Sequence, residues 1–123
     1  MKKNLQLGIS ASVVVLVAFV YGANPSKILP LFFDFRVENL ELKNIFRAVM
    51  GLYFGFAVYW IYGIVKPKCW RSATLSNVIF MGGLALGRLI SLVIDGVSKQ
   101  FLIGMLLEAI MMCWGIYNLK KEV

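Results

Sequence analysis

The sequence contains no histidine, and charged residues make up only 15% of its 123 positions. The absence of histidine removes the most common proton-transfer side chain near neutral pH and the most common metal ligand in proteins. Two cysteines, Cys69 and Cys113, are too few for a zinc site made of cysteines or for a disulfide-dense secreted scaffold. The sequence also has no Ser/His or Cys/His arrangement, so we expect no metal, no cofactor and no catalytic residues.

Hydrophobic residues take the place of the missing charges and account for 60% of the chain. Soluble domains are nearer to about 45–50% apolar, so this composition is wrong for a soluble fold. About 20 consecutive apolar residues cross the hydrocarbon core of a bilayer. We therefore predict an all-α polytopic membrane protein, a single domain over residues 1–123 whose antiparallel bundle has four transmembrane helices at about 5–22, 40–65, 72–94 and 100–119.

The first apolar stretch has an alternative interpretation. Lys2 and Lys3 precede an apolar run that ends at Val20-Tyr21-Gly22, which resembles a secretory signal peptide with its cleavage site. The apolar run is long for a signal peptide, so we favour a membrane span.

The basic residues are distributed unequally between the two sides of a four-span protein. One side receives four basic and four acidic residues, whereas the other receives seven basic residues and Glu122: Lys2, Lys3, Lys66, Lys68, Arg71, Lys120 and Lys121. Positive charge is retained on the cytoplasmic side of membranes, so we expect both termini in the cytoplasm. These charges lie at helix ends and turns, so we expect membrane lipids as partners and no nucleic acid.

The connection at residues 22–39 is unusually apolar, with the run from Ile28 to Phe35. The run is too short to span a bilayer. We expect an interfacial loop on the outer leaflet, and a lid across the outer mouth of the bundle is the alternative.

Three charged residues lie deep inside the predicted spans, more than one helical turn from the span ends, where an ionisable group costs about 2.5–3.5 kcal/mol. At a helical rise of about 1.5 Å per residue, Arg47 and Arg88 lie roughly 10 Å below the outer ends of their helices, and Glu108 lies roughly 12 Å below. We predict that they form one buried cluster. An ion pair is the structural alternative, but one carboxylate cannot neutralise two guanidiniums, and the residual positive charge suits an anionic headgroup.

Smaller residues on the same helices extend this prediction. Asn44 shares a helical stripe with Arg47, and Ser91 and Asp95 share one with Arg88. Small residues four apart let helices approach closely, which predicts helix packing at two glycine pairs: Gly51 with Gly55, and Gly83 with Gly87.

Two segments, Glu41 to Tyr53 and Gly82 to Gly96 followed by Glu108, resemble a bacterial four-helix integral membrane family known as domain of unknown function 4345. The resemblance spans nearly the whole chain. It implies an inner-membrane protein without an assigned activity, and its signature positions would be Arg47, Gly51, Gly87, Arg88, Asp95 and Glu108.

Three classes of function fit these features. We favour a non-enzymatic bundle that binds a lipid-like or anionic amphipathic ligand, or a membrane partner, at the Arg47, Arg88 and Glu108 cluster. A small proton-coupled transporter is an alternative, although an arginine beside Glu108 would favour the ionised carboxylate and hinder proton uptake. A membrane enzyme acting on a lipid, with Glu108 as acid/base, is the other. Whether the chain forms a homodimer is left open.

Overall fold

The computed structural model describes residues 2–122, which are largely helical and contain no strand. Four helices are long, and the short elements lie in the connections between them. In chain order the elements are α1 (Lys2–Gly22), α2 (Pro25–Phe32), α3 (Leu40–Val65), the 3₁₀ helix η1 (Pro67–Cys69), α4 (Trp70–Ile94) and α5 (Lys99–Lys121). The predicted all-α fold class with four long apolar helices is confirmed.

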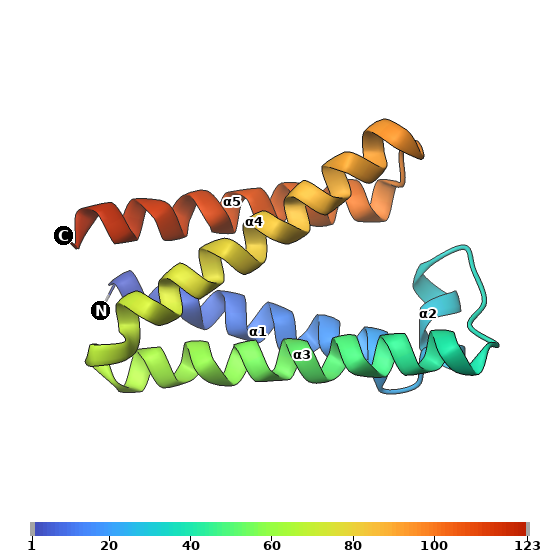
Figure 1. The fold of residues 1–123 in the computed structure, drawn as a ribbon, viewed down its shortest axis with the longest axis horizontal. Coiled ribbons are helices and arrows are strands. Elements are labelled where there is room, and N and C mark those ends of the chain that lie inside the picture. Colours follow the sequence, from blue (N-terminus) through green and yellow to red (C-terminus); the bar gives the residue numbers. More distant parts are fainter. Residues whose placement is uncertain (1, 123) are drawn as a thin grey trace.

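The long helices form two antiparallel pairs, α1 with α3 and α4 with α5 (Figure 1). Both ends of the described chain lie at one end of the bundle together with η1, and we call this the terminal end. Helix α2 and the turn between α4 and α5 lie at the opposite end, which we call the α2 end. Short connections explain the antiparallel order, because a helix that follows a tight turn must run back along its neighbour.

The segment at 22–39, predicted as an interfacial loop, contains helix α2. Pro25 occupies the start of this helix, where the N–H that proline lacks would have no helical partner. Leu29 is fully buried, whereas Leu31 on the opposite side is 79% exposed. The apolar run therefore forms a short helix that packs one side against the bundle.

The turn between α4 and α5 aligns these two helices. Gly96 has a φ of 112°, a left-handed conformation that glycine adopts without steric penalty. The turn occupies only a few residues, so α5 returns directly alongside α4. Residues at similar distances from the turn are thereby brought to the same level, which is how Arg88 and Glu108 come to face each other.

The packed core lies towards the terminal end. Leu7 of α1, Trp60 of α3 and Ala73 of α4 have no exposed surface. A polar link crosses this core, because the Gln6 amide donates to Asn77 Oδ1 at 2.6 Å and to the Met111 carbonyl at 3.0 Å. This link joins α1 to both α4 and α5.

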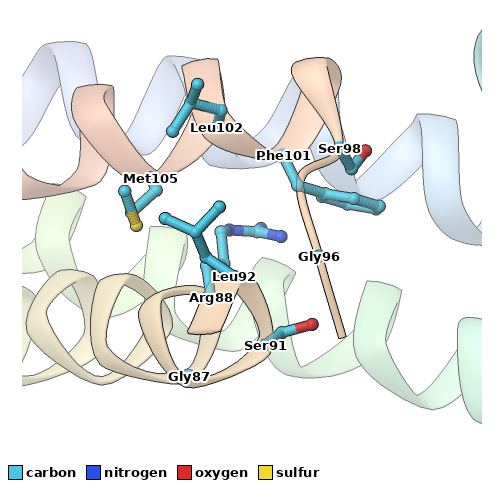
Figure 2. Close-up of a pocket in the computed structure, with 9 residues that line it drawn as sticks. All are labelled: Gly87, Arg88, Ser91, Leu92, Gly96, Ser98, Phe101, Leu102 and Met105. Atoms are coloured by element: carbon cyan, nitrogen blue, oxygen red, sulfur yellow. The ribbon is translucent and has the colours of Figure 1, made fainter. Parts of the chain in front are cut away.

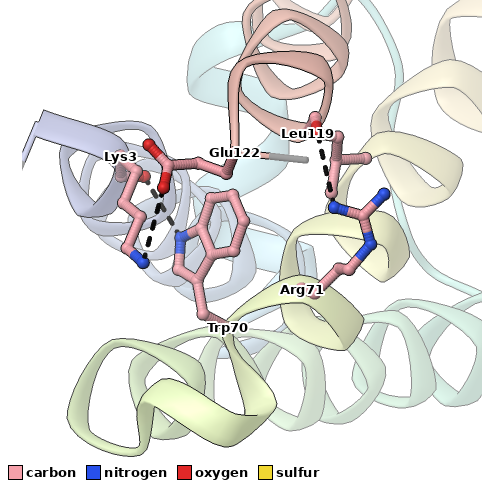
Figure 3. Close-up of polar contacts among 5 residues, drawn as sticks. All are labelled: Lys3, Trp70, Arg71, Leu119 and Glu122. Atoms are coloured by element: carbon pink, nitrogen blue, oxygen red, sulfur yellow. Dashed lines mark hydrogen bonds and ion pairs between the residues drawn. The ribbon is translucent and has the colours of Figure 1, made fainter.

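Further contacts hold the terminal end together (Figure 3). The Lys3 ammonium lies 3.9 Å from Glu122 Oε1 and 4.8 Å from the centre of a Trp70 ring. The Trp70 indole N–H donates to the Lys3 carbonyl at 3.4 Å, and Arg71 donates to the Leu119 carbonyl at 3.3 Å. The starts of α1 and α4 are thus connected to the end of α5.

Helices approach each other closely at several glycines. A methyl group on Gly63 of α3 would overlap the Ala73 side chain of α4, and one on Gly115 of α5 would lie 2.6 Å from Val78 Cγ2. The four glycines predicted to mediate helix packing have no atom within 4 Å of an added Cβ: Gly51, Gly55, Gly83 and Gly87.

Packing is looser towards the α2 end. The buried residues of α4 all lie between Trp70 and Met81, and those of α5 are Gly115 and Asn118. Beyond them the α4–α5 pair diverges from the α1–α3 pair (Figure 1). The resulting space between the two pairs contains the candidate site.

The outer surface of the bundle is apolar. Val93 is 77% exposed, and Leu16 and Ile79 are each 66% exposed. All four long helices are long and apolar enough to cross a membrane. Apolar surface of this extent is suited to lipid contact rather than to water, so the chain has the architecture of a membrane protein.

Candidate functional site

Within residues 2–122, one salt bridge joins inward-facing side chains of two long helices. It is formed by Arg88 of α4 and Glu108 of α5. Arg88 Nε donates to Glu108 Oε1 at 2.8 Å, and Nη2 donates to Oε2 at 3.2 Å. The two side chains are 19% and 13% exposed. This is a bidentate, largely buried ion pair, the geometry in which arginine and carboxylate bind most strongly.

An aromatic ring covers the guanidinium group of this pair. Arg88 Cζ lies 4.9 Å from the ring centre of Phe101, a residue of the first turns of α5. Phe101 in turn stacks on Phe33 with ring centres 4.8 Å apart and planes inclined by 11°. The cation–π contact stabilises the arginine charge on the side that Glu108 does not reach.

Three cavities meet at Arg88 and Phe101. The hairpin cavity, of about 300 Å³, lies between α4 and α5 and includes Ser91 and Ser98 in its lining. Figure 2 shows the Arg88 side chain extending across this cavity towards Phe101. The α3 cavity, of about 320 Å³, lies between α3 and α4 and includes Gly83.

The third space, the main cavity, lies between the two helix pairs and measures about 290 Å³. Its lining is mostly apolar, with four valines of α1 facing leucines of α4 and α5. Its polar groups come from the Arg88–Glu108 pair, Tyr21, Tyr53 and Gln100. An apolar space with a few polar groups on its wall is the usual form of a small-molecule site in proteins.

The segment from Phe32 to Phe35 bridges the open ends of the two helix pairs. The Gln100 amide of α5 donates to the Phe32 carbonyl at 3.2 Å. Phe33 lies 5.7 Å from Phe35, and Phe35 lies 6.2 Å from Phe46 of α3, measured between ring centres. This row of aromatic rings connects α5 to α3 beside the main cavity.

The structure places Arg47 away from Glu108. Its Nη1 donates to the carbonyls of Gly22 and Ala23, each at 2.9 Å, at the end of α1. The last turn of α1 contains no basic residue of its own. Arg47 therefore supplies the positive charge and hydrogen bonds that the exposed carbonyls at a helix C-terminus favour.

This placement predicts the effect of replacing Arg47. We expect Arg47→Ala to lower the free energy of unfolding by about 2 kcal/mol, because two charge-assisted hydrogen bonds are lost. Arg47→Lys should recover part of this loss, since it keeps the charge. Equilibrium unfolding in detergent micelles measures both variants, and an Arg47→Ala protein as stable as the wild type would contradict the prediction.

The other predicted site residues lie around the pair rather than on it. Ser91 lines the hairpin cavity and donates to Asp95 Oδ2 at 2.8 Å. Asp95 and Asn44 are exposed and line none of the three cavities. Gly83 and Gly87 line the α3 cavity, where their lack of side chains leaves space beside Arg88.

Sequence reasoning missed Phe101 and the aromatic row that continues from it. One signal was available, because Phe101 precedes Glu108 by seven residues and so lies on the same face of α5. The stacking of Phe33 on Phe101 had no such signal, because it depends on how the connection after α2 folds back.

The site combines an apolar space with one largely buried ion pair. The two charges of the Arg88–Glu108 pair neutralise each other. Among residues 2–122 there is no group of three side chains able to hold a metal ion. The arrangement can accept a mostly apolar molecule with a small polar end.

No curated protein and no solved structure matches the chain. One family model matches residues 3–118, and its description is "Domain of unknown function (DUF4345)". The match covers nearly the whole chain and confirms the resemblance noted in the sequence, so the chain belongs to the DUF4345 family.

Proposed function

We propose that this chain is a non-enzymatic protein of the bacterial cytoplasmic membrane that binds a lipid-like amphipathic ligand in the main cavity, beside the Arg88–Glu108 pair. The observation that carries the proposal is the main cavity itself, an apolar space of about 290 Å³ with a buried ion pair on its wall. A closely packed membrane bundle would have no such space between its helix pairs.

The position of the cavity supports a ligand that comes from the bilayer. The cavity lies where the two helix pairs diverge, and these helices are apolar on their outer surfaces. A hydrocarbon chain can leave the bilayer for this space without entering water. The polar groups on the wall then hold one end of the molecule.

The charge distribution supports the orientation. Seven basic residues and Glu122 belong to the terminal end, whereas the α2 end has equal numbers of basic and acidic residues. Under the positive-inside rule the terminal end faces the cytoplasm. The main cavity then opens in the outer half of the membrane.

Native mass spectrometry of protein extracted in a mild detergent tests the proposal. We expect the wild-type chain to retain an amphipathic molecule of constant mass. Gly104→Leu should abolish retention, because Gly104 lines the main cavity and a Cβ there would lie 3.8 Å from Arg88 Nε, so the leucine side chain would occupy the site.

Gly55→Leu provides the matched control, because an added Cβ at Gly55 has no atom within 4 Å and Gly55 lines none of the three cavities. This variant should retain the molecule as the wild type does. A retained mass that is unchanged in Gly104→Leu, or the absence of any retained molecule from all three proteins, would refute the proposal.

A further inference from the structure

We propose that the ligand of the main cavity carries an uncharged hydroxyl group at its polar end, rather than a phosphate or a carboxylate. This inference rests on the proposed function and specifies the class of ligand. It departs from the expectation of an anionic headgroup, because that expectation required Arg47 to add its charge to the cluster, and Arg47 is bonded to the end of α1.

The first support is the balance of charge around the cavities. Among residues 2–122, Arg88 and Glu108 are the only charged residues that line the three cavities. They form a bidentate pair at 2.8 and 3.2 Å, so their charges cancel. An anionic ligand would leave one uncompensated negative charge in a largely buried apolar space, which is unfavourable.

The second support is that one edge and one face of the Arg88 guanidinium are already in contact with other groups. Glu108 holds one edge of the guanidinium, and the Phe101 ring lies over its face at 4.9 Å. The ring is fixed from behind by its stack on Phe33. An anion bound to the remaining edge of the guanidinium would lie close to the Glu108 carboxylate, which would repel it.

The third support is the set of hydrogen-bond donors and acceptors that the Arg88–Glu108 pair does not itself use. The hydrogen bonds within the pair use Arg88 Nε and Nη2, so they leave Nη1 and a further lone pair on each carboxylate oxygen of Glu108. A hydroxyl group is both a donor and an acceptor. It can accept from Nη1 and donate to Glu108 without changing the net charge.

The fourth support is the lining of the rest of the main cavity, which suits a hydrocarbon chain. Val13, Val17 and Leu107 are among its apolar residues. A cavity of about 150 Å³ lined by such side chains holds a molecule of benzene. The main cavity, with about 290 Å³, therefore accommodates a chain segment, and the rest of the chain extends into the bilayer.

Binding of three probes with the same chain tests the inference: tetradecan-1-ol, tetradecanoate and tetradecyl phosphate. Delipidated wild-type protein in neutral detergent micelles is titrated with each probe at about pH 9, where carboxylate and phosphate are ionised. The shift in melting temperature, followed by tryptophan fluorescence, reports binding. The same titrations of Gly104→Leu measure effects of the probes on the micelle, which are subtracted.

We expect the alcohol to bind the wild-type protein about tenfold more tightly than either anion, which corresponds to about 1.4 kcal/mol. Glu108→Gln should reverse this order, because it leaves the Arg88 charge uncompensated. The double variant Arg88→Gln with Glu108→Gln restores neutrality and should prefer the alcohol again. It takes the place of Glu108→Gln in the test if that single variant does not fold.

The possible failures are distinguishable. Tighter binding of tetradecanoate or tetradecyl phosphate to the wild-type protein would overturn the hydroxyl inference and leave the proposed function standing. Equal shifts for wild type and Gly104→Leu with all three probes would overturn both, because no ligand would then occupy the main cavity.

Discussion

Replacing Glu108 with alanine is expected to lower the free energy of unfolding by about 3 kcal/mol, because the substitution leaves Arg88 charged and without its partner in a largely buried position. The charge cannot escape to water easily, since the Phe101 ring covers the guanidinium and the surrounding helices are apolar. Equilibrium unfolding in mixed detergent micelles measures the loss.

A double variant separates the effect of charge from that of packing. Replacing both partners with apolar residues of similar size, Arg88→Met with Glu108→Leu, removes the ion pair without leaving an isolated charge. Such replacements are often close to neutral for stability. We expect the double variant to lie within about 1 kcal/mol of the wild type. A double variant as unstable as Glu108→Ala would show that packing, and not the unpaired charge, determines the loss.

A second large effect is expected at the contact between α3 and α4. Gly63→Val should lower the free energy of unfolding by about 3 kcal/mol, because the new side chain would overlap Ala73 and its Cβ would lie 3.4 Å from the Cys69 carbonyl oxygen. The two helices would have to separate at Ala73, which is fully buried. Thermal unfolding in detergent measures the change.

Gly55→Val is the matched control on the same helix. A Cβ at Gly55 has no atom within 4 Å, so the same substitution meets no neighbour there. We expect a change of less than about 1 kcal/mol, because valine is no worse than glycine within a helix. If Gly55→Val were as destabilising as Gly63→Val, Gly55 would have to contact a partner outside this chain, as the sequence-based prediction of helix packing at that position would allow.

The four long helices could be predicted from the sequence because their signal is local. Long apolar stretches bounded by charges and turn residues give the expected ranges, and the observed helices extend only a few residues beyond them. The exception is α2, because a segment of eight helical residues containing two prolines has no clear periodic signal. Its helix depends on burying Leu29 against the bundle.

The candidate site could be predicted in part. Arg88 and Glu108 flank one tight turn, so counting the helical rise from that turn places them at the same level, and in the structure they are in contact. Arg47 lies at a similar depth, but depth does not specify the direction in which a side chain points. It faces the end of α1, whose carbonyls lacked a partner.

Sequence alone determined the helical class, the four apolar spans and the unequal distribution of basic residues, because each depends on composition and on neighbours in the chain. Tertiary structure decided which glycines mediate close contacts, where Arg47 bonds, and that Phe33, Phe101 and the main cavity surround a neutral ion pair. These features depend on which helix faces meet. Apolar residues cover nearly every face of a membrane helix, so the sequence pattern does not specify these faces and side-chain packing determines them.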